Sequence, residues 1–568
     1  MLNRKIPQLL ALFVLAGTLA LYALELRSLF IVPVYDSVRW GGDETWLMRE
    51  FGNQARHGVM QYPENFGGAP RTDGVLAGSM WSDALIYGVP GNLLWTSYDY
   101  ASIGRTVTAT LGLLLIASLY FILRRLGVQQ LIAAISIALM VVNQGFVWAT
   151  HSARYDLLTG LTLLWYCYYL ARLSARGLIL SKAPSPSGER GLGVRFSASI
   201  FGIASVATII FSRHMLTLGL PATLLCLWSL RIWKSRNVLL AYIIGAIGTV
   251  LFLSIVYWAG AGEFSLFGRG GNLGSFRFVI RQIPIFRPFS RNVQISNLGE
   301  RLGLLYRDIP GILILLAAMI VLVIGYKAWQ WSMLRKGTRI KLAITPHQQF
   351  FLLSCLLCSL SWLLLEGSRP YYLFHVVPLL IVGGAVTLEL WSEVYQSRWS
   401  AKAAAIAILV AGLFLQAGHA LPSMTLGNAI AQDQSAAIKH LMKECHTESG
   451  RKSRVLFDVA GLDRALTDTI VQIMTLDMFQ PTPSADDAIR KLEINRIDFV
   501  VLRSSPVSTP FEPGRALLPH ILDSIGEVRD SALGFFYDDG RTYDENLSTM
   551  IEKGLDTLRL YSTHWTPH

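Results

Sequence analysis

The residues best suited to chemistry are carboxylates placed next to predicted apolar segments. Asp43 and Glu44 occur in the stretch Trp40–Trp46, soon after the first of these segments. There a carboxylate could take a proton from an acceptor hydroxyl or bind a cation. The pair is also typical of a helix start, with Asp at the cap and Glu near the positive end of the helix dipole. The local sequence by itself favours the helix start, so a catalytic interpretation needs support from the rest of the chain.

A third carboxylate, Asp156, follows His151 and Arg154 in the sequence. It precedes or enters the fourth predicted apolar segment, and an ionisable residue at that depth in a membrane is costly and often functional. Two structural interpretations stand beside the functional one: an ion pair between Asp156 and Arg154, and a plain helix cap. The sequence does not separate them.

Basic side chains recur in loops that the topology below places outside the membrane. Short translocated loops usually avoid positive charge, so these positions call for a reason. An Arg fork suits a phosphate group, and a lipid phosphate at the outer surface would be a natural partner. General headgroup binding and snorkelling explain single arginines in the loop 260–308, but explain less well those in tight turns. The candidates for phosphate binding are Arg71, Arg213 and Arg369, with Tyr371 and Tyr372 beside the last.

The composition places these residues in a membrane protein. Of 568 residues, 52% are hydrophobic and 15% are charged, with a mean hydropathy of +0.42, whereas an average domain has about 25% charged residues. This excludes a disordered chain, a basic nucleic-acid-binding domain and an ordinary soluble enzyme, and it favours a polytopic α-helical membrane protein. Residues 1–420 hold 35 Lys/Arg and 17 Asp/Glu, and residues 421–568 hold 15 and 21, so an apolar, basic front precedes a mildly acidic tail.

The apolar runs predict about eleven spanning helices, each of about 20 residues. The first run follows Arg4 and Lys5 and lacks a clear cleavage site, so we interpret it as an uncleaved helix. The predicted spans are 7–25, 104–123, 130–149, 155–173, 196–212, 214–230, 238–259, 309–329, 348–366, 371–391 and 403–420.

The loops between these spans alternate in charge, which predicts the orientation. Basic clusters follow the second, fourth, sixth, eighth and tenth spans, beginning with Arg124 and Arg125. The positive-inside rule assigns those loops and the N-terminus to the cytoplasm. The outer side then receives the loops 26–103 and 260–308 and the tail.

The tail, residues 421–568, has the pattern of a small extracytoplasmic α/β domain. Strand-like runs occur at 454–460 and 497–502, a helical run at 486–494, and a final strand and turn at 534–540. Of the five cysteines, four lie in apolar runs. They predict no disulfide framework, and the spacing of Cys355 and Cys358 indicates packing more than zinc binding.

Taken in order, these motifs resemble the GT-C superfamily of polyprenyl-phosphate-sugar-dependent glycosyltransferases, and within it the protein-mannosyltransferase-like and aminoarabinose-transferase-like membrane enzymes. The chain lacks the proline pair common around Arg71 and has Arg213 and His214 where relatives have Lys-Gly. It also lacks a Trp-Trp-Asp sequence, which argues against an oligosaccharyltransferase. The resemblance rests on Asp43-Glu44, the stretch Phe66–Arg71 leading towards Trp81, Asp156, the run Ser212–Pro221 and the run Arg369–Pro378.

The resemblance implies that the enzyme transfers a sugar from a lipid-linked donor to a hydroxyl outside the membrane, usually with inversion. Asp43 would be the general base, and Asp156 would orient Asp43 or the sugar. His151 or His214 could help bind a divalent metal, which some relatives carry and others lack. Arg71, Arg213 and Arg369 would hold the leaving phosphate, with Tyr371 and Tyr372 as hydrogen-bond donors.

Two other function classes stay open at this point. A transporter or flippase of a lipid-linked sugar would also use outward cations and buried carboxylates, but no inverted repeat is evident. A scaffolding protein would leave Asp43 and Asp156 on one face unexplained.

The expected partners are the sugar donor, a glycan, lipid or protein acceptor and membrane lipids, without nucleic acid. The short loops suggest a bacterial inner membrane.

Overall fold

The computed structural model describes a set of helices and one β-sheet. The residues that it describes are 2–31, 86, 100–151, 156–182, 199–200, 202, 215–229, 239–248, 251, 299, 302–303, 305–306, 309–318, 320–321, 344–365, 373–394, 401–418, 444–445, 453–457, 471–475, 484–503, 522, 526–534 and 556–563.

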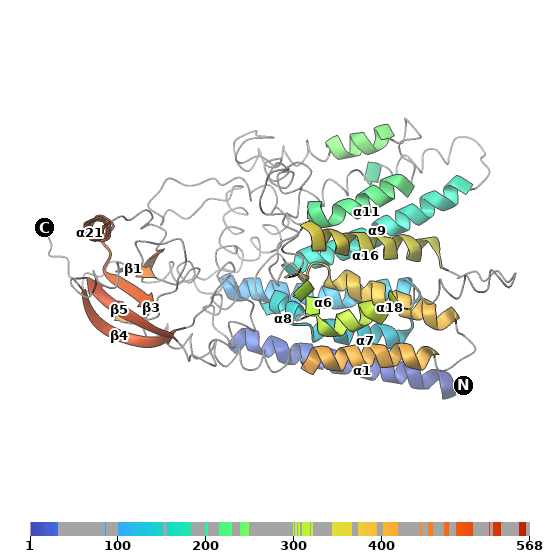
Figure 1. Cartoon of the computed structure of the whole chain (residues 1–568), viewed down its shortest axis with the longest axis horizontal. Helices are drawn as coiled ribbons and strands as arrows, with labels where there is room; N and C mark the ends of the chain where they lie inside the picture. Colours follow the sequence, from blue (N-terminus) through green and yellow to red (C-terminus); the bar gives the residue numbers. More distant parts are fainter. Residues whose placement is uncertain are drawn as a thin grey trace.

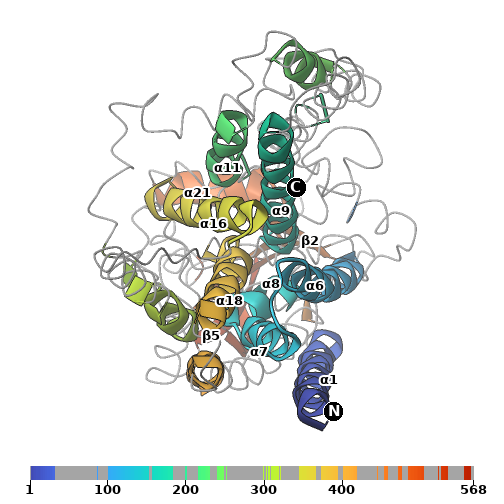
Figure 2. The ribbon, with the colours of Figure 1, turned by 90° about the vertical axis from the view of Figure 1, so that its right-hand side faces the viewer.

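The helices run side by side as a bundle along the long axis of the molecule, and Figure 2 views them nearly end-on. α1 lies at one edge against α7, whereas α9, α11 and α16 pack together on the other side (Figures 1 and 2). Shorter helical stretches occur at 239–248 and 310–318, and a longer one at 401–418. The labelled helices are α1 (Leu2–Ile31), α6 (Tyr100–Arg125), α7 (Gln130–Val141), α8 (Gln144–His151), α9 (Asp156–Lys182), α11 (Met215–Ser229), α16 (Pro346–Leu365) and α18 (Val377–Val394).

Several of these helices are apolar. Within the described ranges, 3 are both long and apolar enough to cross a membrane: Ile6–Leu26, Gly104–Arg125 and Ala401–Gly418. Each coincides with a span predicted from the sequence. The total of about eleven spans stays a prediction, because most of the segment 196–212 and parts of others lie outside the described residues.

The predicted span 130–149 is divided in the structure. α7 ends at Val141, and α8 begins after Asn143, whose Oδ1 accepts a hydrogen bond from the Phe146 N–H at 3.2 Å. This is the geometry of an N-cap, since the Asn side chain satisfies a free N–H of the first turn. Asn143 is 1% exposed, so a polar group sits inside an apolar span and interrupts it.

Side chains from two later helices fix the turn between α6 and α7. Gly127 adopts φ +89°, a conformation that favours glycine. Gln348 of α16 donates a hydrogen bond to the Leu126 carbonyl at 2.7 Å, and Glu389 of α18 accepts one from the Gln129 N–H at 2.8 Å. The basic end of α6, predicted to face the cytoplasm, is thereby tied to the second half of the chain.

Packing in the bundle relies on small side chains as well as on large ones. The thiols of Cys167 and Cys358 lie 3.7 Å apart between α9 and α16. All five cysteines are buried and free, and burial of Cys355 and Cys358 agrees with the packing role predicted for that pair.

The C-terminal residues form a sheet of five strands in the order β2-β1-β3-β5-β4. β1 pairs in parallel with β2 and β3, whereas β5 is antiparallel to both β3 and β4. Figure 1 shows this sheet and α21 (Ala485–Ile494) beyond one end of the helices. The strands are β1 (Ser453–Phe457), β2 (Val471–Thr475), β3 (Phe499–Arg503), β4 (Gly526–Gly534) and β5 (Asp556–Thr563).

Three of the predicted tail elements are observed as β1, α21 and β3. The predicted strand 534–540 falls outside the described residues apart from Gly534, which ends β4. β2, β4 and β5 were not predicted. β2 pairs with β1, and β5 pairs with both β3 and β4, a long-range effect that a local pattern does not contain. Leu456, Leu492, Val500 and Tyr561 join the sheet and α21 in one buried cluster.

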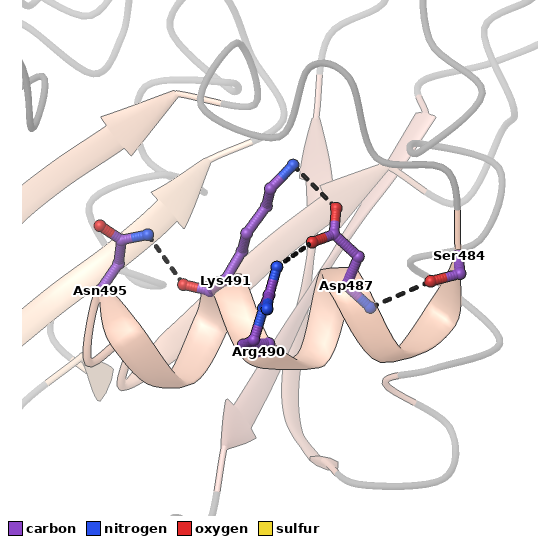
Figure 3. Close-up of polar contacts among 5 residues, drawn as sticks. All are labelled: Ser484, Asp487, Arg490, Lys491 and Asn495. Atoms are coloured by element: carbon purple, nitrogen blue, oxygen red, sulfur yellow. Dashed lines mark hydrogen bonds and ion pairs between the residues drawn. The ribbon is translucent and has the colours of Figure 1, made fainter.

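α21 is stabilised by its own polar side chains, as Figure 3 shows. The Ser484 hydroxyl accepts a hydrogen bond from the Asp487 N–H at 3.2 Å and caps the helix. The Asp487 carboxylate lies 3.1 Å from Lys491 Nζ and 3.1 Å from Arg490 Nη2. The hydrogen bond from Lys491, with help from Arg490, lowers the pKa of Asp487.

This pKa shift predicts a pH-dependent contribution to helix stability. Because the folded pKa lies below the usual Asp value of about 3.9, the contribution is complete above that value and is lost as pH falls through the folded pKa. We expect amides of α21 to exchange hydrogen faster in Asp487→Asn than in wild type at pH 6. Below a pH of about 3.9, the exchange rates of α21 amides in the two proteins should become more alike. Exchange mass spectrometry of the full-length protein, with both proteins at each pH, measures these rates. If Asp487→Asn accelerated the exchange of α21 amides by the same factor at every pH, the ion-pair explanation would be refuted.

Two glycines allow the helical stretches 310–318 and 401–418 to touch. A Cβ added at Gly311 would collide with the Gly412 carbonyl oxygen, and the Gly311 N–H donates a hydrogen bond to Gln416 Oε1 at 3.2 Å. Close backbone approach through small residues is typical of helix pairs in membranes.

We expect Gly311→Ala to destabilise the protein by about 1–3 kcal/mol, since the added methyl group must push the helices apart. A thiol-reactive dye reports thermal unfolding in detergent, because every cysteine is buried in the folded chain. Gly17→Ala in α1 is the matched control, since a Cβ there meets nothing within 4 Å. An unchanged midpoint for Gly311→Ala would disprove the contact.

Candidate functional site

The most unusual polar feature of the described bundle is a buried contact between Asp156 and His375. His375 Nε2 lies 2.9 Å from Asp156 Oδ1, and the two side chains are 0% and 3% exposed. They are 219 positions apart in the sequence. Hydrogen bonds to a carboxylate are strong where water is excluded, so this contact holds two distant parts of the chain together.

Each partner of this pair sits at the start of a helix. Asp156 is the first residue of α9, where a negative charge is favoured by the helix dipole. His375 lies in a turn in which the Val376 N–H bonds to the Leu373 carbonyl at 3.1 Å, and this turn leads into α18. With an ionised Asp156 as acceptor, Nε2 is the ring nitrogen that carries the proton.

Two glycines border the turn 373–376 on the neighbouring helices. A Cβ added at Gly160 of α9 would lie 3.4 Å from the Phe374 ring, and one added at Gly145 of α8 would lie 3.4 Å from Phe374 Cβ. Both are ordinary van der Waals distances, so Phe374 lies directly beside both glycines. The sequence therefore places glycine where α8 and α9 contact the turn that carries His375.

Aromatic packing connects the same turn to the N-terminal helices. The ring of Phe146 lies between Tyr22 and Phe374, with centroid distances of 5.6 and 6.3 Å. The Tyr22 hydroxyl donates a hydrogen bond to the Ala109 carbonyl at 2.7 Å. α1, α6, α8 and the turn before α18 thus share one buried contact region beside the Asp156–His375 pair.

Asp156 has a buried partner that the sequence motifs did not single out. The partner of Asp156 shown here is His375, which the sequence analysis did not select although it lies inside the run Arg369–Pro378. The available signal was a titratable ring in an apolar run directly after the Arg/Tyr cluster. The predicted partner Arg154 lies outside the described residues.

Most of the other predicted site residues also lie outside the described residues. His151 is the last residue of α8, but its side chain is not described. The structure does bring Asp156 into contact with His375, which belongs to the described part of the run 369–378. The residues not described are Asp43, Glu44, Arg71, Arg213, His214, Arg369, Tyr371 and Tyr372.

A metal centre is not evident in the part of the chain that the structure describes. No group of three or more His, Cys, Asp or Glu side chains is arranged there to hold an ion. The Asp156–His375 pair by itself would offer a metal ion two ligands. What the described geometry provides is a carboxylate held in a fixed orientation in a water-poor setting.

Comparison with known proteins gives several solved structures of similar shape. An apo oligosaccharyltransferase from Archaeoglobus fulgidus has 12% identity and a TM-score of 0.45, covering 87% of this chain and 69% of that one. Apo ArnT from Cupriavidus metallidurans has 12% identity and a TM-score of 0.46, covering 97% of each chain. ArnT bound to undecaprenyl phosphate has 13% identity and a TM-score of 0.42, again covering 97% of each chain. No family model matches the sequence, and no curated protein matches it.

The likeness to these solved structures is one of shape alone. With TM-scores of 0.42 to 0.46 and identities of 12 to 13%, they transfer no residue role to this chain.

The Asp156–His375 contact predicts an order of stability among variants. Asp156→Leu should lower stability by about 1–3 kcal/mol, because it leaves the buried His375 without this acceptor. Asp156→Asn keeps an oxygen acceptor and should cost less. Thermal unfolding in detergent with the thiol-reactive dye gives the order. Equal midpoints for wild type and Asp156→Leu would show that the pair contributes nothing to stability.

Proposed function

We propose that the protein is a membrane glycosyltransferase that takes a sugar from a polyprenyl-phosphate donor. It transfers the sugar to a hydroxyl of an envelope glycan, lipid or protein on the outer face of the membrane. The bond between the anomeric carbon and the phosphate oxygen breaks, and a bond from the acceptor oxygen forms on the opposite face, which inverts the configuration. The acceptor proton passes to Asp43, and polyprenyl phosphate leaves.

One observation carries this proposal. Asp156 and His375 touch although each belongs to a separate motif of the resemblance, one at the head of the fourth predicted span and one in the late Arg/Tyr/Pro run. Their contact supports a single outer site in which a carboxylate and phosphate-binding groups face the same substrate. A protein without such a site would have little reason to retain a buried carboxylate there.

Each candidate residue has a role in the proposed reaction that suits the chemistry of its side chain. Asp43 acts as general base, with Glu44 beside it, and Asp156 orients Asp43 or the sugar. Cationic forks stabilise charge as it develops on the leaving phosphate. A divalent metal held by His151 or His214 would add positive charge near that phosphate, and no step is assigned to it. The phosphate-binding set is Arg71, Arg213 and Arg369, with Tyr371 and Tyr372 as donors.

The same proposal assigns the parts of the chain to compartments. Residues 1–420 form the transmembrane catalytic domain, with the outer loop at about 26–103. Residues 421–568 form an α/β domain on the extracytoplasmic side of a bacterial inner membrane, and the N-terminus is cytoplasmic. The sheet and its helix α21 support a separate folded unit, because they bury a core of their own.

A flippase of a lipid-linked sugar is the second candidate, and one observation favours it. The helix interrupted at Asn143 is a discontinuous apolar helix, a feature that transporters use at their binding sites. The topology predicted from the sequence places the candidate residues at one membrane face, and this favours the transferase.

The first experiment compares wild type with Asp43→Asn in matched detergent. Each protein is incubated with polyprenyl-phosphate sugars and a membrane extract, and released polyprenyl phosphate is measured. We expect release by wild type and a loss of about 10²–10⁴-fold in Asp43→Asn, the usual contribution of a general base.

Glu44→Gln is the matched control, because it neutralises the adjacent carboxylate and should reduce release much less than Asp43→Asn. Release at wild-type level in Asp43→Asn would move the base to Glu44 or Asp156. No release from any donor, in a folded wild type, would reject the transferase in favour of the flippase. Movement of a labelled lipid-linked sugar in vesicles then tests that second candidate.

A further inference from the structure

We infer that His375 is a positioning residue of the proposed transfer reaction and that it acts through Asp156. The inference rests on the proposed function and extends it to a residue that no sequence motif had singled out. It is carried by the contact between the two side chains and by the packing that fixes each of them.

The contact restricts the orientation of Asp156. His375 Nε2 lies 2.9 Å from Oδ1, so a carboxylate that accepts this bond is anchored through one oxygen to a buried ring. This contact restricts the directions open to the other carboxylate oxygen. This is the arrangement required of a group that orients a base or a sugar hydroxyl, because small misplacements near a reacting centre are costly to the rate.

The ring of His375 is itself held rigidly. Its side chain is 0% exposed, and the preceding Phe374 packs against Gly145 of α8 and Gly160 of α9. The turn is closed by the hydrogen bond from the Val377 N–H to the Phe374 carbonyl at 3.2 Å. A ring held by such a turn has little freedom to move, so its hydrogen bond also limits the positions open to the Asp156 carboxylate.

The position of His375 in the sequence gives it a second connection to the proposed site. It closely follows Arg369, Tyr371 and Tyr372, the groups proposed to bind the leaving phosphate. One anchored turn therefore links the carboxylate at the head of α9 to the phosphate-binding run. A hydrophobic residue at this place would pack, but it could not hold the carboxylate.

The test measures kcat and KM for the donor in His375→Leu and His375→Gln, together with the thermal midpoint of each. We expect His375→Leu to lower kcat about 10- to 100-fold, with KM for the donor nearly unchanged, because the carboxylate is misplaced and donor binding is intact. His375→Gln should recover most of kcat, since its amide N–H can still donate to Asp156. His347→Leu is the matched control; this histidine packs on Tyr168, with ring centroids 5.0 Å apart, and should leave kcat unchanged.

A double-mutant cycle separates positioning from simple stability. If His375 acts through Asp156, then adding His375→Leu to Asp156→Leu should reduce kcat little further. The inference would be overturned if His375→Leu lowered kcat by the same factor in the Asp156→Leu background as in wild type. It would also be overturned if His375→Gln lowered kcat as much as His375→Leu. Wild-type kcat in a folded His375→Leu would overturn it as well while leaving the transferase intact. A folded wild type without release would reject the proposed function itself, and the inference with it.

Discussion

The arrangement of one end of the described bundle depends on keeping a carboxylate out of water. An isolated ionised carboxylate in an apolar interior is very costly, so Asp156 requires a partner with a hydrogen-bond donor. His375 supplies that donor from a turn far along the chain. The glycines at 145 and 160, the aromatic ring of Phe374 and the start of α18 all serve the approach of that turn. The packing is best understood as the consequence of one polar requirement.

Polar groups also fix the opposite, predicted cytoplasmic end, but with a different chemistry. There Gln348 and Glu389 bind backbone groups at the turn between α6 and α7. These contacts satisfy N–H and carbonyl groups that a helix end leaves free. The end that holds Asp156 and His375 instead joins two side chains from distant parts of the chain. Because burying two such side chains carries a desolvation cost, their pairing favours a functional explanation.

The sequence could predict features that depend on composition and local period. The apolar helices, the strands β1 and β3 and the helix α21 follow from such patterns, and Asp156 could be selected because charge is rare in apolar spans. Features set by long-range contacts could not be predicted. β5 is a strand because it pairs with β3 and β4. The break at Asn143 depends on a cap inside an apolar run. The importance of His375 becomes visible only when the fold brings the turn before α18 to the start of α9. For Asp43 and the arginines, the sequence remains the source of the assignment.

The break at Asn143 and the Asp156–His375 pair belong to one region, which bears on the choice between transferase and flippase. Phe374 contacts Gly145 just after the break, and its neighbour His375 holds Asp156. A transport path needs its polar groups to separate and re-form as the helices move. Here the polar pair is 0% and 3% exposed and is enclosed by close glycine and aromatic contacts. Such a region suits a rigid platform for chemistry at one face better than a moving gate, because tightly packed interfaces resist gradual deformation. The interrupted helix is then most simply explained as the means by which α8 reaches the turn that holds the carboxylate.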